Sequence, residues 1–235
     1  MGNSISRIAE YYRRHGLVAT IRRAGLAATR ALIANRMVVF YCDLNTQTAA
    51  PSTLPDSFKV DRLNAELQIG AQDLDQITRF WMPEVVKRNI EQRFAQGASL
   101  WLIKSGEKLA GYGWTLKGGS IEPYYFPLGS DDVHLFDFYV FPHYRGRGIN
   151  PRLVAYILRE LAADCGGRAF IEAAEWNQAQ LSSLRKTEFL HLGLVRSFSV
   201  FGGKYVHWVE GQAAEQIRKD AKRSNQLLRI AKSHE

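Results

Sequence analysis

The chain reads FYVFPHYRGRGINP from Phe138 to Pro151, and the fold prediction depends mainly on this stretch. It begins within an apolar run from Val133 to Val140, which is typical of a buried β-strand. From Asn150 to Cys165 apolar residues recur at helical spacing, with Asn150 suited to cap the helix and Pro151 suited to its first turn. The stretch therefore predicts a strand, a glycine-containing loop and a helix in direct succession.

The loop between this strand and this helix has the chemistry of an anion site. The first N–H groups of a helix have no partner within the helix, and the helix dipole adds partial positive charge there. Gly146 and Gly148 let the backbone approach a ligand closely, and Arg145 and Arg147 add positive charge. A Gly-x-Gly pair alone fits an ordinary strand-to-helix turn equally well. With its surroundings, the loop is predicted to bind phosphate.

The remaining sequence predicts a mixed α/β fold with a mostly antiparallel sheet. The turn Ser105-Gly106-Glu107 joins two strand patterns in a hairpin, and a second hairpin is expected around Gly202-Gly203. Strands are expected at 36–43, 58–69, 99–103, 108–117, 133–140, 168–174, 194–201 and 205–210, and helices at 5–34, 73–81, 83–96, 150–165 and 178–189.

The phosphate loop resembles motif A of the GNAT acyltransferase superfamily, in which a strand ending Val-x-Pro leads into Arg/Gln-x-x-Gly-x-Gly/Ala. Val140, Pro142, Arg145 and Gly148 match this motif, and Asn150 stands where the motif has its last Gly or Ala. The Asn150 side chain is therefore expected to cap the helix and to crowd the phosphate partly.

A second match lies downstream, in the order and spacing of the same family. Asn177, Ser183, Lys186 and Phe189 are similar to the pattern Asn-x-x-Ser-x-x-Ser-x-x-Lys-x-Gly-Phe, with Glu188 in place of the glycine. The resemblance covers residues 57–210 and implies a mixed, mostly antiparallel sheet with splayed central strands, flanked by helices.

The resemblance also implies acetyl-CoA, or another acyl-CoA, as co-substrate. The loop would hold its pyrophosphate, the pantetheine arm would lie between the two splayed strands, and a backbone N–H near Val140 would be the oxyanion donor. The residues that it assigns to coenzyme binding are Phe138, Tyr139, Val140, Arg145, Gly146, Arg147, Gly148, Ile149, Asn150, Asn177 and Ser183.

The resemblance places the general base at Glu172, five residues before Asn177, where several relatives have a catalytic carboxylate. A glutamate in a salt bridge or facing solvent fits this position equally well. His134 occupies another place where the family puts its base, and Asp137 and Glu175 are further candidates.

The position of the usual general acid, a tyrosine in the family, is Leu184. Ser183, Tyr139 or Tyr144 can take its place, or the thiolate leaves unassisted, because a thiol is already acidic enough. An acceptor surface is expected at Trp81, the Trp101–Trp114 hairpin and Tyr124-Tyr125-Phe126, although such residues are more often core.

The 235 residues and 46% hydrophobic content predict one domain with appended ends. Residues 1–36 carry seven arginines against one glutamate, and residues 211–235 are also basic, whereas the part between is nearly neutral. We expect a basic helix, strand and linker at 1–56, an acyltransferase domain at 57–210 and a basic helical tail at 211–235.

The predicted activity is transfer of an acyl group from its CoA thioester to a primary amine by direct attack in a ternary complex. The acceptor would be a small-molecule or peptide amine, and no nucleic-acid partner is expected. The alternative is a catalytically weak CoA-binding module that acts through its basic ends, notably residues 1–36, on a membrane surface or polyanion. Cys42 and Cys165 have no metal-ligand spacing, and we expect no metal and a cytoplasmic location.

Overall fold

The computed structural model describes residues 16, 36–47, 54–55, 57–79, 83–122, 124–164, 166–200 and 203–210. The helix expected at 5–34 and the tail expected at 211–235 lie outside these residues, apart from Gly16.

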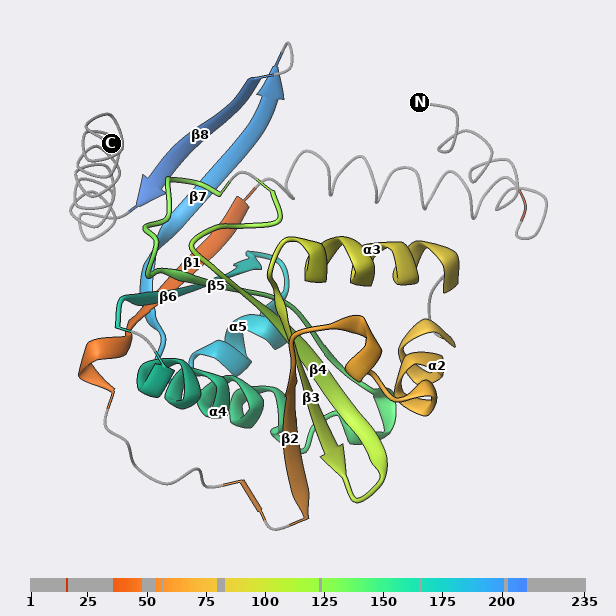
Figure 1. The fold of residues 1–235 in the computed structure, drawn as a ribbon. Coiled ribbons are helices and arrows are strands. Elements are labelled where there is room, and N and C mark those ends of the chain that lie inside the picture. Colours follow the sequence, from red (N-terminus) through yellow and green to blue (C-terminus); the bar gives the residue numbers. More distant parts are fainter. Residues whose placement is uncertain are drawn as a thin grey trace, which may run out of the picture.

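Eight strands form one sheet in the order β2-β3-β4-β5-β6-β1-β7-β8 (Figure 1). Within this sheet β5 and β6 run parallel, and every other neighbouring pair is antiparallel. The expected mixed, mostly antiparallel α/β sheet is confirmed. The strands are β1 (Arg36–Asp43), β2 (Phe58–Leu63), β3 (Ser99–Ser105), β4 (Lys108–Lys117), β5 (Val133–Val140), β6 (Arg168–Ala174), β7 (Leu190–Val200) and β8 (Gly203–Glu210).

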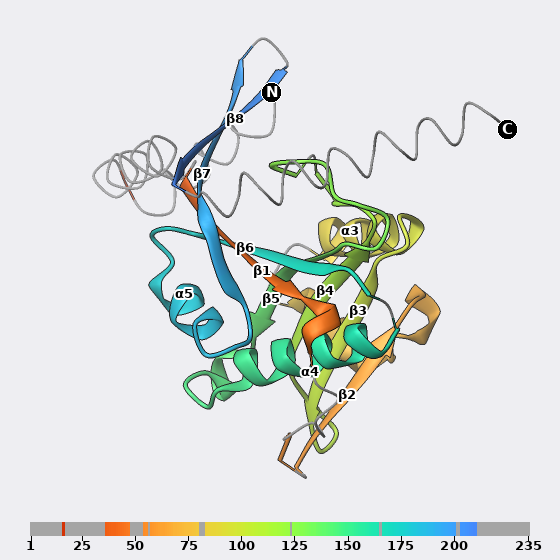
Figure 2. The ribbon, with the colours of Figure 1, turned by 90° about the vertical axis from the view of Figure 1, so that its left-hand side faces the viewer.

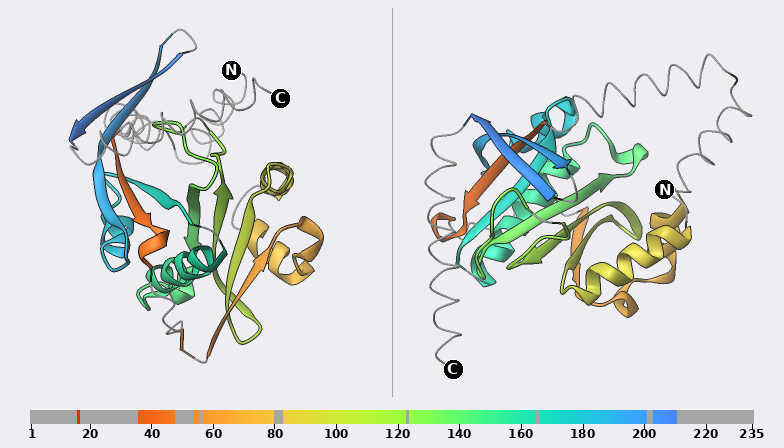
Figure 3. Two further views of the ribbon diagram at one scale, coloured as in Figure 1. Left: turned by 60° about the vertical axis from the view of Figure 1, so that its left-hand side comes forward. Right: turned by 90° about the horizontal axis from the view of Figure 1, so that it is seen from above.

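Helices cover both faces of the sheet. Helices α4 and α5 lie on one face, and α2 and α3 lie on the other (Figures 1 and 3). Helix α5 ends five residues earlier than the sequence predicts, because a turn at 185–188 leads directly into β7. The helices are α2 (Ala71–Arg79), α3 (Pro83–Ala95), α4 (Ile149–Asp164) and α5 (Gln178–Leu184), with short 3-10 turns at Leu44–Thr46, Glu66–Gln68 and Pro142–Tyr144.

Two tryptophans expected at an acceptor surface belong to the core. Trp101 is 1% exposed and donates to Thr115 Oγ1 at 2.9 Å, while Trp114 is 2% exposed and meets Phe94 of α3 edge-on. Burial of a large apolar side chain stabilises the folded chain by roughly 1.5–3 kcal/mol. The β3–β4 hairpin therefore supplies packing for both helical layers. Trp81, also expected at the acceptor surface, lies outside the described residues.

Strand β1 lies inside the sheet, between β6 and β7. It pairs antiparallel with both strands, from Met37↔Ala174 to Asp43↔Arg168 on one side and from Arg36↔Arg196 to Tyr41↔Leu190 on the other. Val39, Phe40 and Cys42 are buried in it. The expected boundary near residue 56 therefore does not separate this strand from the rest of the sheet, because its apolar side chains complete the core.

The far end of the sheet is the long hairpin of β7 and β8, which extends beyond the other strands (Figures 1 and 2). The first residues of β7 pair with β1, and its last residues pair with β8 alone. No helix within the described part of the chain is long and apolar enough to cross a membrane.

The parallel pair of β5 and β6 is joined at only one end. The strands pair at Val133↔Ala169, His134↔Phe170 and Leu135↔Ile171, and beyond these three positions they diverge. β5 continues to pair with β4 as far as Val140, and β6 continues to pair with β1 as far as Ala174. A gap therefore opens through the sheet between Phe136–Val140 and Glu172–Ala174, which is the splay that the family resemblance implies.

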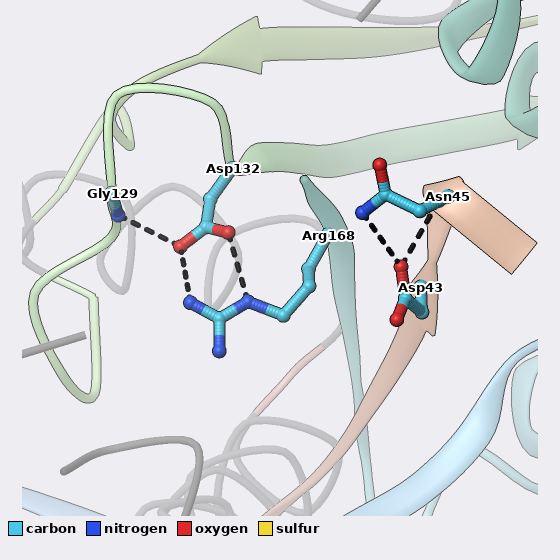
Figure 4. Close-up of polar contacts among 5 residues, drawn as sticks. All are labelled: Asp43, Asn45, Gly129, Asp132 and Arg168. Carbon is cyan, nitrogen blue, oxygen red and sulfur yellow. Dashed lines mark hydrogen bonds and ion pairs between the residues drawn. The ribbon is translucent and has the colours of Figure 1, made fainter. Parts of the chain in front are cut away.

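A buried ion pair holds the joined end of these two strands together (Figure 4). Asp132, just before β5, accepts from Arg168 Nε at 3.0 Å and from its NH2 group at 3.1 Å, and it also accepts from Gly129 N at 2.7 Å. Asp132 is 3% exposed. Nearby, Asp43 accepts two bonds from Asn45 and caps the turn that follows β1.

Candidate active site

The loop between β5 and α4 has the backbone that its glycines predict. Gly146 and Gly148 have φ angles of +77° and +70°, a region that favours glycine. Helix α4 begins at Ile149, so Asn150 lies in its first turn and does not cap it, contrary to the sequence prediction. Helix boundaries commonly move by one or two residues, and Pro151 still needs no N–H partner there.

The amides that open α4 are free to bind a ligand. No described residue accepts a hydrogen bond from the N–H groups of residues 146–150. These groups lie at the positive end of the helix dipole, which favours an anion. The loop can therefore grip a phosphate with its backbone.

The Asn150 side chain bridges two helices instead of covering the loop. Its Nδ2 donates to Ser183 Oγ at 2.9 Å, and its buried Oδ1 has no hydrogen-bond partner among the described residues. Asn177 caps α5 by accepting from Gln180 N at 3.2 Å. Asn177 and Ser183, two of the four residues of the second motif, therefore lie beside the phosphate loop.

A cavity of about 470 Å³ lies over this loop. The residues assigned to coenzyme binding from the sequence all line it except Arg147, whose guanidinium lies over the Tyr144 ring at 5.7 Å. A cavity of this size suits a small organic ligand. Its walls are Phe138, Tyr139, Val140, Tyr144, Arg145, Gly146, Gly148, Ile149, Asn150, Pro151, Asn177, Ala179, Gln180, Ser182, Ser183 and Lys186.

The backbone of Val140 faces the gap between β5 and β6. Phe141 N donates to Ala110 O at 3.0 Å, toward β4. Because successive residues of a strand alternate in direction, the N–H and C=O of Val140 point away from β4. Arg145 Nε donates to the Val140 carbonyl at 3.0 Å, and its guanidinium lies 5.5 Å from the Tyr139 ring centre. The Val140 N–H therefore points into the gap, and its role as an oxyanion donor stays a prediction of the family resemblance.

Glu172 is the first residue of β6 beyond its last pairing with β5. Ile171 and Ala173 belong to the core cluster that contains the buried side of α4, so Glu172, which alternates with them, faces the other side of the sheet. The cavity and Glu172 therefore lie on opposite faces, at the two openings of one gap.

Glu172 and His134, two of the four candidate bases, are in contact. Nε2 of His134 lies 3.0 Å from Oε2 and 3.2 Å from Oε1 of Glu172, and its Nδ1 lies 3.1 Å from Ser120 Oγ. The imidazole ring is buried and contacts the rings of Tyr124 and Phe136. Ser120 carried no signal in the sequence, because a loop brings it back over the sheet from fourteen residues away.

Tyr124 and Tyr125 surround the same carboxylate. Burial raises the pKa of Tyr124 well above its ordinary value, and the Glu172 charge raises it further. Burial and the same charge also raise the pKa of Tyr125. Both phenols stay protonated at neutral pH, so the aromatic loop noted in the sequence packs around the candidate base with neutral groups.

The third candidate base, Asp137, lies apart from this pair. It forms a β-bulge opposite Gly113, with φ +52°, and its carboxylate accepts from Arg93 NH1 of α3 at 2.5 Å. A Cβ at Gly113 would come within 2.4 Å of the Phe138 ring, so a larger residue there would displace this ring. Leu184 is fully buried and provides no proton.

No group of three or more side chains suited to hold a metal ion occurs among the described residues. Cys42 is buried, and this burial raises the pKa of its thiol to about 12. Cys165 lies outside the described residues.

A parallel strand pair that opens beside a loop of free amides defines the class of CoA-dependent N-acyltransferases. The model of the Acetyltransferase (GNAT) family matches residues 67–189, which is more than half of the chain. The chain therefore belongs to the GNAT acetyltransferase family, whose members use acetyl-CoA as co-substrate. No curated protein matches the chain.

Solved structures with a similar fold share little sequence with this chain. A protein from Drosophila is 14% identical with a TM-score of 0.48, over 74% of this chain and 50% of that one. A putative GNAT acetyltransferase from Novosphingobium aromaticivorans is 13% identical with a TM-score of 0.44, over 68% and 60%. The ribosomal-protein-S18-alanine N-acetyltransferase of Escherichia coli is 15% identical with a TM-score of 0.39, over 55% and 74%. The chain thus spans about half to three-fifths of the first two structures.

Proposed function

We propose that this protein transfers an acyl group, in the first instance acetyl, from its CoA thioester to a primary amine by direct attack in a ternary complex. This proposal rests on the free amides of residues 146–150. They lie beside a cavity that is also lined by Phe138–Val140, the edge of β5 that faces the β5–β6 gap. They fit a ligand that has a diphosphate at one end and a narrow polar arm at the other.

The residues of the cavity suit each part of an acyl-CoA. The phosphate loop and Arg145 bind the diphosphate, and the open edge of β5 from Phe138 to Val140 pairs with the amides of the arm. The Val140 N–H stabilises the oxyanion that forms when the thioester is attacked.

Glu172 is the general base of this proposal. It stands at the opening of the gap opposite the cavity, so an amine that approaches from that face meets the carboxylate before it meets the thioester. The carboxylate removes the proton of the amine, and general bases typically contribute 10²–10⁴-fold to the rate. Asp137 is paired with Arg93, which favours Glu172 over it.

Proton return to the leaving thiolate falls to the cavity tyrosines in this proposal. Tyr139 and Tyr144 both line the cavity, whereas the family's usual position is the apolar Leu184. A thiolate is a tolerable leaving group, so this contribution is expected to be small.

Calorimetric titration with acetyl-CoA, followed by a thiol-release assay over a panel of amines, tests the function. We expect saturable binding at one site per chain and release of CoA that depends on an amine. A wild-type protein that binds no CoA ester would exclude the proposed function.

A further inference from the structure

A series of hydrogen bonds leads from the candidate base to a loop on the sheet surface. Glu172 accepts from the imidazole of His134, and the other ring nitrogen of His134 faces the hydroxyl of Ser120. The three side chains come from β6, β5 and the loop after β4. Their order in space is fixed by the fold, although they are far apart in the sequence.

The chemistry of these groups sets the direction of each hydrogen bond. A carboxylate only accepts hydrogen bonds, so Nε2 of His134 carries the hydrogen that faces Glu172. A neutral imidazole has one N–H, so Nδ1 accepts, and the Ser120 hydroxyl donates to it. Glu172 therefore sets the tautomer, and the Ser120 hydroxyl satisfies the remaining ring nitrogen, Nδ1.

Packing fixes the ring in this orientation. His134 is 4% exposed, and its ring centre lies 4.9 Å from that of Tyr124 and 5.2 Å from that of Phe136. Its direct neighbours across the sheet, Leu116 and Phe170, are apolar. The imidazole cannot turn without losing these contacts and both hydrogen bonds.

Other ionisable groups lie around the pair. Tyr124 and Tyr125, from the loop, stay protonated at neutral pH, and both phenols face the Glu172 charge. Arg93 of α3 lies over the Phe136 ring at 5.4 Å and is paired with Asp137. His134 contacts both oxygens of the Glu172 carboxylate, at 3.0 and 3.2 Å.

We propose that Glu172 sets the His134 tautomer with hydrogen on Nε2, that the Ser120 hydroxyl holds the ring from its Nδ1 side, and that His134 thereby holds Glu172 as an oriented carboxylate ready to take a proton from the amine. His134 and Ser120 are positioning residues, and His134 is not itself the base. This inference rests on the proposed acyl transfer for its effect on rate, whereas the tautomer is a property of the protein alone.

The first test measures the tautomer without any substrate. The imidazole nitrogens of 15N-labelled protein, read by NMR, are expected to show His134 with hydrogen on Nε2 in the wild type, and the Nδ1 resonance is expected to shift in Ser120→Ala, which removes its donor. Ser120→Thr keeps the hydroxyl and is expected to keep the wild-type Nδ1 resonance. A wild-type ring with hydrogen on Nδ1, or an unchanged Nδ1 resonance in Ser120→Ala, overturns the proposal whether or not the protein binds CoA.

The second test measures the pH dependence of kcat/KM for the amine at saturating acetyl-CoA. A carboxylate that loses an N–H donor binds a proton more readily, so the acid limb of the profile moves to higher pH. In His134→Leu we expect a shift of about one pH unit and a rate loss of about 10–100-fold at pH 7, with unchanged CoA affinity. His134→Gln, which keeps an N–H donor, is expected to show a smaller pH shift and a smaller rate loss than His134→Leu.

Ser120→Ala keeps the core intact and provides the same readout if His134→Leu fails to fold. We expect a loss of about 3–10-fold, because the hydrogen bond concerned is worth roughly 1 kcal/mol. Ser130→Ala, an exposed serine of the same loop, is the matched control and should leave the profile unchanged. An unshifted acid limb in both Ser120→Ala and His134→Leu, or an acyl adduct on Ser120 by mass spectrometry, overturns the positioning role.

Discussion

At the scale of single residues, the acyl-transfer proposal concentrates on Glu172, which combines partial burial with a place at the apex of the gap. Glu175 directly follows β6, three residues after Glu172, and is paired with Arg36 at 2.9 Å. Both glutamates stand near the motif asparagine, and the sequence alone leaves both as candidate bases. The strand pairing favours Glu172, because it directly follows the last residue of β6 that is bonded to β5.

Glu172→Gln is therefore expected to lower kcat about 100-fold or more while the acetyl-CoA dissociation constant stays within about twofold. Stopped-flow thiol release and calorimetry measure the two quantities. Glu175→Gln is the matched control and should retain most activity. Equal losses in both variants would show that the region matters as a whole and that neither carboxylate is the base.

Gly148 has a positive φ and is the last residue of the loop whose amides face the cavity. Gly148→Val is expected to weaken acetyl-CoA binding about tenfold or more, because a branched side chain resists this backbone conformation and pushes the amides out of place. Gly106→Val places the same side chain at φ +57° in the turn between β3 and β4. This control should cost stability without weakening the CoA affinity, and equal affinity losses would refute the loop assignment.

The raised pKa of Tyr124 makes a prediction about stability at high pH. The unfolded chain releases the phenol proton near pH 10, and the folded chain keeps it to higher pH. The contribution of the Tyr124 phenol to the free energy of unfolding is thus fully present below pH 10 and decreases as the pH rises above 10. Urea unfolding at pH 9 and pH 10.5 should show a smaller fall in Tyr124→Phe than in the wild type; an identical fall would mean that the phenol is not buried.

At the scale of elements, the sequence predicted most strands and helices, since their apolar periodicity is strong. The positions of β4, β5 and β6 are confirmed as expected, and the parallel, splayed pair follows from the family resemblance. The predicted start of α4 was wrong, because the helix begins at Ile149 and leaves Asn150 in its first turn, where its Nδ2 donates to Ser183. Contacts made by long loops, such as that of Ser120 with His134, have no local pattern in the sequence.

The gap between β5 and β6 depends on the pair of Asp132 and Arg168 at its joined end. Asp132→Asn removes the charge that Arg168 faces and is expected to destabilise the protein by about 3 kcal/mol, near the lower limit for a buried pair because Arg168 is partly exposed. Asp131→Asn affects the adjacent, exposed contact with Lys117 and should change stability by less than about 0.5 kcal/mol. Urea unfolding gives both values, and similar values would refute the role of the pair.

At the level of the complete molecule, the sheet includes four strands from outside the stretch that the family model matches, namely β1, β2, β7 and β8. Of these, β1 precedes residue 67 and yet lies between β6 and β7. The sequence predicted the strand itself but not its place, because its continuous apolar run does not say which neighbours it pairs with. The division at residue 56 rested on a polar, proline-containing linker, and a linker can join two strands of one sheet.

A chain that begins at residue 57 is consequently expected not to fold. Its loss of β1 would expose the backbone edges of β6 and β7 together and would remove Val39, Phe40 and Cys42 from the core. Each buried side chain contributes roughly 1.5–3 kcal/mol, which together approaches the whole stability of a domain. A chain that begins at residue 36 keeps the strand and should show the cooperative unfolding that the shorter chain lacks. If circular dichroism gave the two chains the same melting curve, β1 would be dispensable and residues 57–210 would be an independent domain after all.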